Sequence, residues 1–217
     1  MPEPATLTLV GTGFVAMGVR YLRRKYRSAK PLFDRTIAMA LLIALSPVIV
    51  VCALLVKLTS RGPAFYRQER VGENGRIFTI VKLRTMRRDA EAKTGPVWAD
   101  GDNDPRVTPV GYVLRKTYLD ELPQLVNVLR GEMSLVGPRP ERPYFVDRLK
   151  KIVPDYESRL KVKPGITGLA QVRARADREL RDVRRKVKLD AIYASRMCWW
   201  VDFMILLRTM GKFAGRS

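Results

Sequence analysis

One apolar segment limits what this chain can fold into more than any other feature. Residues 36–57 read TIAMALLIALSPVIVVCALLVK, and the first 21 of them carry no charge. That length is enough to cross a hydrocarbon core of roughly 30 Å as a helix. Pro47 lacks a backbone N–H and its ring crowds the carbonyl of Ile43, while the Ser46 hydroxyl is placed to satisfy a freed carbonyl. The segment is therefore either a kinked spanning helix or a helix that breaks and turns back.

The charges that flank this segment favour the second alternative. Basic residues mark the cytoplasmic side of a short membrane element, and here they occur at both ends. They are Arg20, Arg23, Arg24, Lys25, Arg27, Lys30 and Arg35 before the segment, and Lys57, Arg61, Arg67 and Arg70 after it. A spanning helix would place one of these clusters on the wrong side. A hairpin with arms of about ten residues, each rising about 15 Å, leaves both ends inside. We therefore predict a re-entrant membrane helix broken at Ser46 and Pro47.

The chain of 217 residues is long enough for one domain of catalytic size plus a membrane element. We divide it into a basic and apolar N-terminal segment (1–30), the re-entrant helix (31–60) and a cytosolic domain (61–217). Within the first part, residues 7–22 are apolar but short, and are compatible with a short span, an interfacial helix or a loose tail.

The cytosolic part is predicted to be α+β and mostly helical. Asn74-Gly75 lies between two apolar runs and indicates a β-hairpin turning at residues 72–75. Helical patterns follow, and KPGITGLAQV is predicted to be a turn-rich loop. The expected helices cover residues from near Asp120 to Gly131, 143–161 and 177–195, and a tryptophan-rich helix near residues 197–213 has the pattern of an interfacial amphipathic helix or of a core helix.

Charge and composition exclude several classes of chemistry. The chain has 41 basic and 21 acidic residues, a net charge of +20, which indicates a polyanionic partner such as nucleic acid or an anionic lipid surface. The apolar segment favours lipid. The absence of histidine removes Ser-His-Asp machinery and histidine-bound zinc, so chemistry must use carboxylates, Lys, Arg, Tyr or Ser/Thr, with a hard cation bound by oxygen. Cys52 and Cys198 are expected to be small buried hydrophobic residues.

Asp120 and Glu121 are the leading candidates for that chemistry. They are adjacent acids at an expected helix N-terminus and follow Arg115 and Lys116. Such a pair is typical of a helix cap with a first-turn acid. The positive helix end and the nearby cations are also expected to keep both carboxylates ionised, and an ionised carboxylate is able to act as a nucleophile or to bind Mg²⁺.

Three long motifs give the chain a family resemblance. KPLFDRTIAMALLIALSPVIVVCALLVKLTSRGPAFYRQERVG, RKTYLDELPQLVNVLRGEMSLVGPRP and KVKPGITGLAQV occur in the order found in the bacterial sugar transferase family, the monotopic phosphoglycosyl transferases. The resemblance runs from about residue 30 to residue 213. It implies transfer of a sugar-1-phosphate from a UDP-sugar to polyprenyl (undecaprenyl) phosphate at the cytoplasmic face of the bacterial inner membrane, with release of UMP, as the first membrane step of glycan assembly. It also implies a re-entrant helix bent at a Ser-Pro pair.

The resemblance further implies roles for individual residues. Asp120 would attack the sugar-proximal phosphorus and form a covalent phosphosugar, and Glu121 would help Asp120 to hold Mg²⁺. Phosphoryl transfer depends on in-line positioning and charge neutralisation, which a site without histidine is able to supply. Lys82, Arg115 and Arg139 match basic family positions and would neutralise phosphate oxygens, or they are solvated surface cations.

The chain departs from the family pattern after AQV, where Asn-Gly-Arg is common and Arg173, Ala174 and Arg175 stand here. Arg175 keeps the basic position expected to bind phosphate or nucleotide. Asp190 matches another recurrent acid and is a candidate active-site acid. The partners implied are the UDP-sugar, polyprenyl phosphate and anionic membrane lipids, and a homodimer is left open.

Two other classes of function are alternatives to this enzyme. The first is a membrane-tethered nucleic-acid-binding protein, although the chain has no base-reading motif and we expect no nucleic acid as partner. The second is an inactive scaffold for glycan assembly, against which the intact acid pair argues. The sequence does not indicate which sugar is transferred or which glycan is made.

Overall fold

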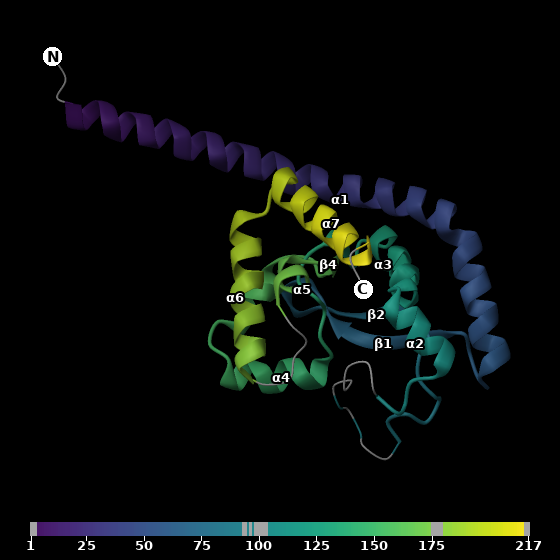
Figure 1. Ribbon diagram of the computed structural model, residues 1–217. Coiled ribbons are helices and arrows are strands. Elements are labelled where there is room, and N and C mark those ends of the chain that lie inside the picture. Colours follow the sequence, from purple (N-terminus) through teal and green to yellow (C-terminus); the bar gives the residue numbers. More distant parts are fainter. Residues whose placement is uncertain (1–3, 93–94, 96, 98–103, 175–179, 215–217) are drawn as a thin grey trace.

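The computed structural model describes residues 4–92, 95, 97, 104–174 and 180–214, with the backbone alone described for residues 4–20 and 213–214. The fold is mostly helical with two small sheets, in agreement with the α+β expectation (Figure 1). In chain order the elements are α1 (Pro4–Thr59), β1 (Phe65–Val71), η1 (Glu73–Gly75), β2 (Ile77–Leu83), α2 (Pro109–Lys116), η3 (Leu119–Gln124), α3 (Leu125–Leu129), β3 (Ser134–Val136), α4 (Pro143–Ile152), η4 (Tyr156–Lys161), β4 (Gly165–Thr167), α5 (Leu169–Arg173), α6 (Leu180–Arg196) and α7 (Trp199–Ala214).

Helix α1 is 56 residues long and contains Pro31 and Pro47. It is helical throughout, without a gap at residue 30 or at Ser46, and it bends in its second half (Figure 1). Pro47 explains the bend, because its ring removes the bond to the carbonyl of Ile43. The Ser46 hydroxyl donates to that carbonyl at 2.8 Å, as expected from the sequence.

The apolar part of α1 lies largely outside the protein core. Among the described residues one helical stretch, Tyr21–Thr59, is long and apolar enough to cross a membrane, and only 11% of its most apolar window is buried. Ile43, Val50 and Leu54 are each more than half exposed. A bent helix with an uncovered apolar surface fits both a kinked span and a re-entrant hairpin.

A buried polar cluster fixes the first half of α1 to the rest of the protein. Lys30 Nζ contacts Asp202 of α7, and the Tyr26 hydroxyl donates to the same carboxylate at 2.6 Å. Tyr193 of α6 donates to the other oxygen of Asp202 at 2.8 Å. Asp34 accepts from Ser134 of β3 at 2.6 Å. Buried charges are stable when they are paired and hydrogen-bonded, so this cluster sets where α1 lies against β3, α6 and α7.

The β-hairpin forms as the sequence predicts. Strands β1 and β2 pair antiparallel from Phe65 opposite Leu83 to Val71 opposite Ile77. The turn uses positive φ at Asn74 (55°) and at Gly75 (78°), conformations that these two residue types adopt readily. The side chain of Asn127 in α3 bonds the backbone of β2 at two points, Val81 N–H and the carbonyl of Thr79, and so holds the hairpin against α3.

Two predicted segments differ from the expectation. KPGITGLAQV is not a simple loop, because β4 pairs in parallel with β3 and α5 follows it. A side chain at Gly137 or Gly165 would collide with the opposite backbone, so glycine allows the two strands to approach. The helix expected over 143–161 is divided into α4 and η4, because the chain is extended at Val153 and left-handed at Asp155 (φ 55°).

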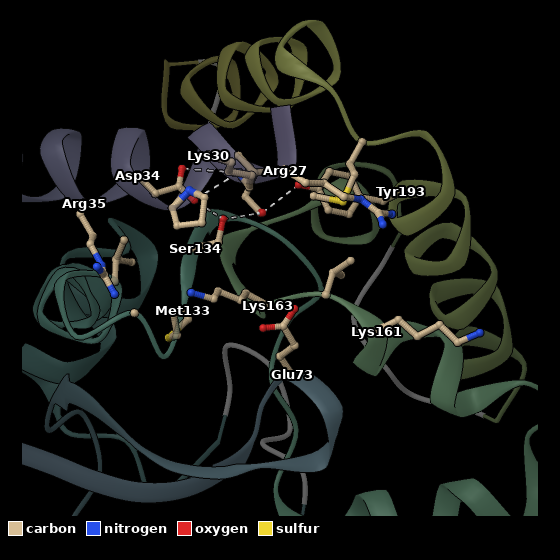
Figure 2. Close-up of a pocket in the computed structure, with 16 residues that line it drawn as sticks. Arg27, Lys30, Asp34, Arg35, Glu73, Met133, Ser134, Lys161, Lys163 and Tyr193 are labelled. Atoms are coloured by element: carbon tan, nitrogen blue, oxygen red, sulfur yellow. Dashed lines mark hydrogen bonds and ion pairs between the residues drawn. The ribbon is translucent and has the colours of Figure 1, made fainter. Parts of the chain in front are cut away.

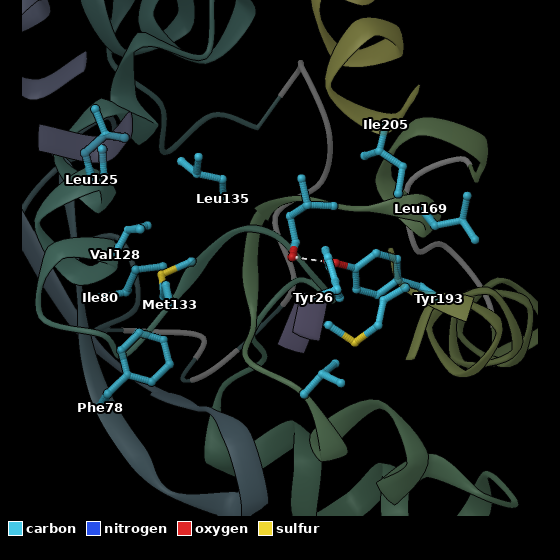
Figure 3. Close-up of a cluster of buried hydrophobic side chains, with 14 residues drawn as sticks. Tyr26, Phe78, Ile80, Leu125, Val128, Met133, Leu135, Leu169, Tyr193 and Ile205 are labelled. Carbon is cyan, nitrogen blue, oxygen red and sulfur yellow. Dashed lines mark hydrogen bonds between the residues drawn. The ribbon is translucent and has the colours of Figure 1, made fainter. Parts of the chain in front are cut away.

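The main hydrophobic core joins α1, the β-hairpin and the C-terminal helices. Tyr26 of α1, Phe78 and Ile80 of β2, and Val128 of α3 belong to one buried cluster that reaches Ile205 of α7 (Figure 3). The Tyr193 hydroxyl, which donates to Asp202, also lies 2.9 Å from the carbonyl oxygen of Val136 within this cluster. Cys52 is also buried, as expected, whereas Cys198 is partly exposed.

Candidate active site

The acid pair lies in a short 3-10 turn and not in the first turn of an α-helix. Asp120 and Glu121 belong to η3, which follows a left-handed Tyr118 (φ 57°), and both are buried, with 8% and 9% of their surface exposed. Leu119, immediately before them, packs on a buried cluster that contains Cys52 and Val56 of α1. The pair is therefore held beside the C-terminal part of α1.

Glu121 is held by two cations. Its Oε1 accepts from Lys82 Nζ of β2 at 2.8 Å and from Arg139 Nη2, also at 2.8 Å, while Arg139 Nη1 lies 3.4 Å from Oε2. Burial alone would raise the pKa of Glu121, but the charges of Arg139 and Lys82 outweigh it and hold that pKa well below the ordinary value. Glu121 is thus a fixed anion that positions the two predicted phosphate-binding cations.

Asp120 differs sharply from its neighbour. Among the described residues no hydrogen-bond donor or cation lies within bonding distance of its carboxylate. Burial, and then the charge of Glu121, raise the pKa of Asp120 to about 6 against the opposing effect of Lys82, Arg139 and Arg115. The sequence predicted that the helix end and the nearby cations keep both acids ionised; at Asp120 burial outweighs the cations, so the pKa rises and does not fall. At neutral pH its carboxylate is still mostly ionised and has no partner in the described structure.

Arg115 approaches the pair from α2. Its Nε donates to the Thr85 hydroxyl at 3.0 Å, which fixes the guanidinium at the end of β2. Burial lowers the pKa of Arg115, and the charge of Asp120 opposes that change. Lys82, Arg115 and Arg139 therefore come together around the acid pair, although they are far apart in sequence. Arg175 lies outside the described residues.

Asp190 contacts the site only indirectly. It is 1% exposed in α6, and its Oδ2 is 3.0 Å from Arg159 Nη2. The same Arg159 nitrogen donates to the backbone carbonyl of Arg139 at 2.8 Å. Burial raises the pKa of Asp190 to about 6, and Arg159 opposes it. Asp190 thus connects to the site through Arg159, a residue that the sequence reasoning missed because only the fold brings it beside Asp190 and the Pro138–Pro140 loop.

The arrangement suits a reaction at a phosphorus atom. An unpaired carboxylate is available as a nucleophile, and three neighbouring cations are placed to neutralise phosphate oxygens. No cluster of three or more acidic or cysteine ligands occurs in the part of the chain that the structure describes. Two adjacent carboxylates are nevertheless compatible with Mg²⁺, which commonly takes one or two carboxylates together with substrate phosphates and water.

Several curated proteins are similar in sequence to most of this chain. A UDP-glucose:undecaprenyl-phosphate glucose-1-phosphate transferase of Caulobacter vibrioides is 46% identical over 178 residues, which cover 80% of this chain and 66% of that protein. The enzyme of the same name from Escherichia coli is 41% identical over 182 residues, or 82% of this chain and 39% of that protein. A UDP-N-acetylgalactosamine-undecaprenyl-phosphate N-acetylgalactosaminephosphotransferase of Aeromonas hydrophila is 43% identical over 165 residues, or 76% of this chain and 38% of that protein.

These relatives are longer than the aligned region, and the chain spans from about two fifths to two thirds of their length. A profile of the PEP-CTERM protein-sorting motif matches residues 2–25 only. The profile described as bacterial sugar transferase matches residues 25–216, which include the bent part of α1, the acid pair and all of the cations around it. The chain therefore belongs to the bacterial sugar transferase family.

Proposed function

We propose that this protein transfers a sugar-1-phosphate from a UDP-sugar to polyprenyl phosphate, with Asp120 as the nucleophile, as the first membrane step in the assembly of a glycan. The observation that carries the proposal is the contrast within the acid pair. Glu121 is neutralised by two cations, whereas Asp120 is buried, mostly ionised at neutral pH and unpaired in the described structure. The names of the relatives, which specify undecaprenyl phosphate as acceptor, support the same reaction class.

The reaction would proceed in two displacements. A carboxylate oxygen of Asp120 attacks the sugar-proximal phosphorus, the bond from that phosphorus to the bridging oxygen breaks, and its electron pair leaves with UMP. An oxygen of the polyprenyl phosphate then attacks the same phosphorus, which regenerates the Asp120 carboxylate and forms the polyprenyl diphosphate sugar. Both attacking groups are anions, so no histidine or other general base is needed.

The cations would act on the developing charge. Arg139 presents a partly exposed guanidinium, with 43% of its side chain accessible, and Lys82 lies beside it on β2. Because Glu121 holds both in place before substrate arrives, little reorganisation is needed when the leaving group gains charge. Arg115 approaches from α2 and would neutralise further oxygens of the diphosphate.

Magnesium is part of the proposal. Asp120 and Glu121 would hold the ion together with the substrate diphosphate. The charge of the ion would neutralise the negative charge on the departing UMP. The unpaired carboxylate of Asp120 is the feature of this chain that favours such binding.

The membrane arrangement supports the same assignment. We propose that α1 enters and leaves at the cytoplasmic face of the inner membrane, with its bend at Ser46 and Pro47 inside the lipid. Helix α7 would lie in the interface, because Trp200, Phe203, Leu207 and Met210 form an exposed apolar stripe on it. The acid pair would then face an acceptor whose phosphate lies at the lipid boundary.

A reconstituted assay tests the reaction. Detergent-solubilised protein is incubated with Mg²⁺, polyprenyl phosphate and a panel of UDP-sugars that includes UDP-glucose and UDP-N-acetylgalactosamine, and UMP is measured. We expect release with at least one sugar, loss of release on chelation, and loss in Asp120→Asn. Asp147→Asn, which changes an exposed acid on α4, is the matched control and should keep activity.

The covalent step has a separate readout. Mass spectrometry of protein quenched during turnover should find a phosphosugar on the peptide that carries Asp120. Full activity in Asp120→Asn would refute the nucleophile assignment, and absence of UMP with every sugar would favour an inactive scaffold.

A further inference from the structure

A cavity of about 150 Å³ lies beneath the middle of α1. Its walls come from α1, from the connection between α3 and β3, from the segment that leads into β4, and from α6 (Figure 2). None of Asp120, Glu121, Lys82, Arg115 and Arg139 lines it. We refer to it as the α1 cavity.

The α1 cavity is strongly positive. Five cations, Arg27, Lys30, Arg35, Lys161 and Lys163, and two acids, Asp34 and Glu73, line it, which leaves three positive charges in excess. Lys30 and Asp34 are used in the buried cluster with Asp202, and Arg27 donates to the carbonyl of Ala194. Lys161 points away from the centre in Figure 2.

Arg35 and Lys163 remain available for a ligand. Among the described residues neither side chain has a hydrogen bond or an ion pair. They come from opposite walls, and the Lys163 ammonium is directed toward the side on which Arg35 descends from α1 (Figure 2). Gly131 contributes to this geometry, since a side chain there would collide with the Arg35 guanidinium. The two cations are thus held apart across a space that an anionic group would fill.

The surroundings of the cavity are those of a lipid boundary. Arg35 is the last charged residue before the apolar segment of α1. On the same part of α1, Leu32 is 72% exposed, and the half-exposed Phe33 packs edge-on against Trp199 of α7 with ring centres 4.8 Å apart. The cavity wall is also largely apolar; Val128, Met133, Val136, Val162 and Met197 line it.

We propose that the α1 cavity binds the phosphate-bearing headgroup of an anionic membrane phospholipid. Arg35 and Lys163 would contact the phosphate, and the apolar wall would contact the glycerol and the first acyl carbons. Basic pockets at the cytoplasmic boundary of membrane helices are suited to anionic headgroups. A free phosphate would use the two cations but would leave the apolar wall without a partner, so the lipid is favoured over a soluble anion.

Native mass spectrometry of the full chain tests this without turnover, so the outcome is independent of the proposed reaction. Delipidated protein in detergent is titrated with phosphatidylglycerol, with phosphatidylcholine and with inorganic phosphate. We expect one tightly retained phosphatidylglycerol, with weaker binding of the other two. Each of Arg35→Gln and Lys163→Gln should weaken retention about fivefold, and the double variant about thirtyfold.

Lys151→Gln is the matched control, because it removes an exposed charge from α4, on the side of the molecule away from α1 and α7 (Figure 1). It should retain phosphatidylglycerol as the unaltered protein does, and thermal unfolding verifies that each variant is folded. Equal loss in Lys151→Gln, or equal retention of the two lipids, would overturn the proposal. Phosphate binding as tight as that of phosphatidylglycerol would do so too, since it would make this a site for a soluble anion.

Discussion

Replacing Asp120 by Asn should stabilise the fold while it removes turnover. The structure buries this carboxylate and gives it no partner among the described residues, and the pKa of Asp120 rises from an ordinary 3.8 to about 6. A pKa difference of that size means that ionised Asp120 destabilises the folded state by about 3 kcal/mol. A buried amide without a complete set of hydrogen bonds would cost about 1 kcal/mol. The expected net gain for Asp120→Asn at neutral pH is therefore about 2 kcal/mol.

The gain should depend on pH in a defined direction. Between about pH 4 and pH 6 the folded protein binds more protons at Asp120 than the unfolded chain does, so the unaltered protein loses stability as the pH rises. The Asn variant has no such loss. The gain of the Asn variant should be fully developed above about pH 6. Below about pH 4 only the cost of its amide should remain, which makes the variant less stable than the unaltered protein by about 1 kcal/mol.

Thermal unfolding in detergent with a chelator present measures this difference. For a chain of this length, about 2 kcal/mol corresponds to a rise in Tm of about 4–8 °C. The chelator is needed because a bound cation would favour the ionised carboxylate. Asp147→Asn should change stability by no more than about 0.5 kcal/mol. An Asn variant that is less stable at pH 8, or a difference that does not grow with pH, would show that Asp120 is stabilised in the fold and would refute the description of an unpaired nucleophile.

Three further predictions concern other parts of the molecule. Glu121→Gln should lower stability by about 3 kcal/mol, measured by thermal unfolding, because the largely buried Lys82 and the partly exposed Arg139 lose their counter-ion. An unchanged Tm would contradict the pairing. Asp190→Asn should raise the KM for the UDP-sugar about tenfold with a smaller change in kcat, because Asp190 holds Arg159 against the loop of Arg139, the arginine that we propose binds substrate phosphate. Asp190→Glu should restore part of the loss, and an effect on kcat alone would argue against this role. Cysteines at Leu32 and Arg61 should both react with a membrane-impermeant reagent from the cytoplasm, whereas opposite-side labelling would show a spanning helix.

Features fixed by neighbours in the chain could be predicted from the sequence. The hairpin follows from Asn74 and Gly75, whose left-handed conformations are local preferences. The bond from Ser46 to the carbonyl of Ile43 follows from the position of Pro47. Lys82, Arg115 and Arg139 were assigned to the site from the family resemblance alone; the fold places them near the acid pair, and their binding of phosphate stays a prediction.

Features that depend on packing could not be predicted in this way. The raised pKa of Asp120 results from burial in η3. The sheet of β3 and β4 uses three residues from each strand, too few to give a periodic pattern. The link from Asp190 through Arg159 to the carbonyl of Arg139 joins three separate segments, and no spacing in the chain indicates it.

The ion pair between Lys30 and Asp202 has a consequence for biogenesis. These two residues are separated by 172 positions, so the ribosome makes the lysine long before the aspartate that neutralises it. During that interval the apolar residues 36–56 of α1 are free to enter the lipid, while the basic residues before them have to stay hydrated. We therefore expect α1 to enter the lipid before it docks against α7, so that the nascent chain is attached to the bilayer while the rest of the protein folds.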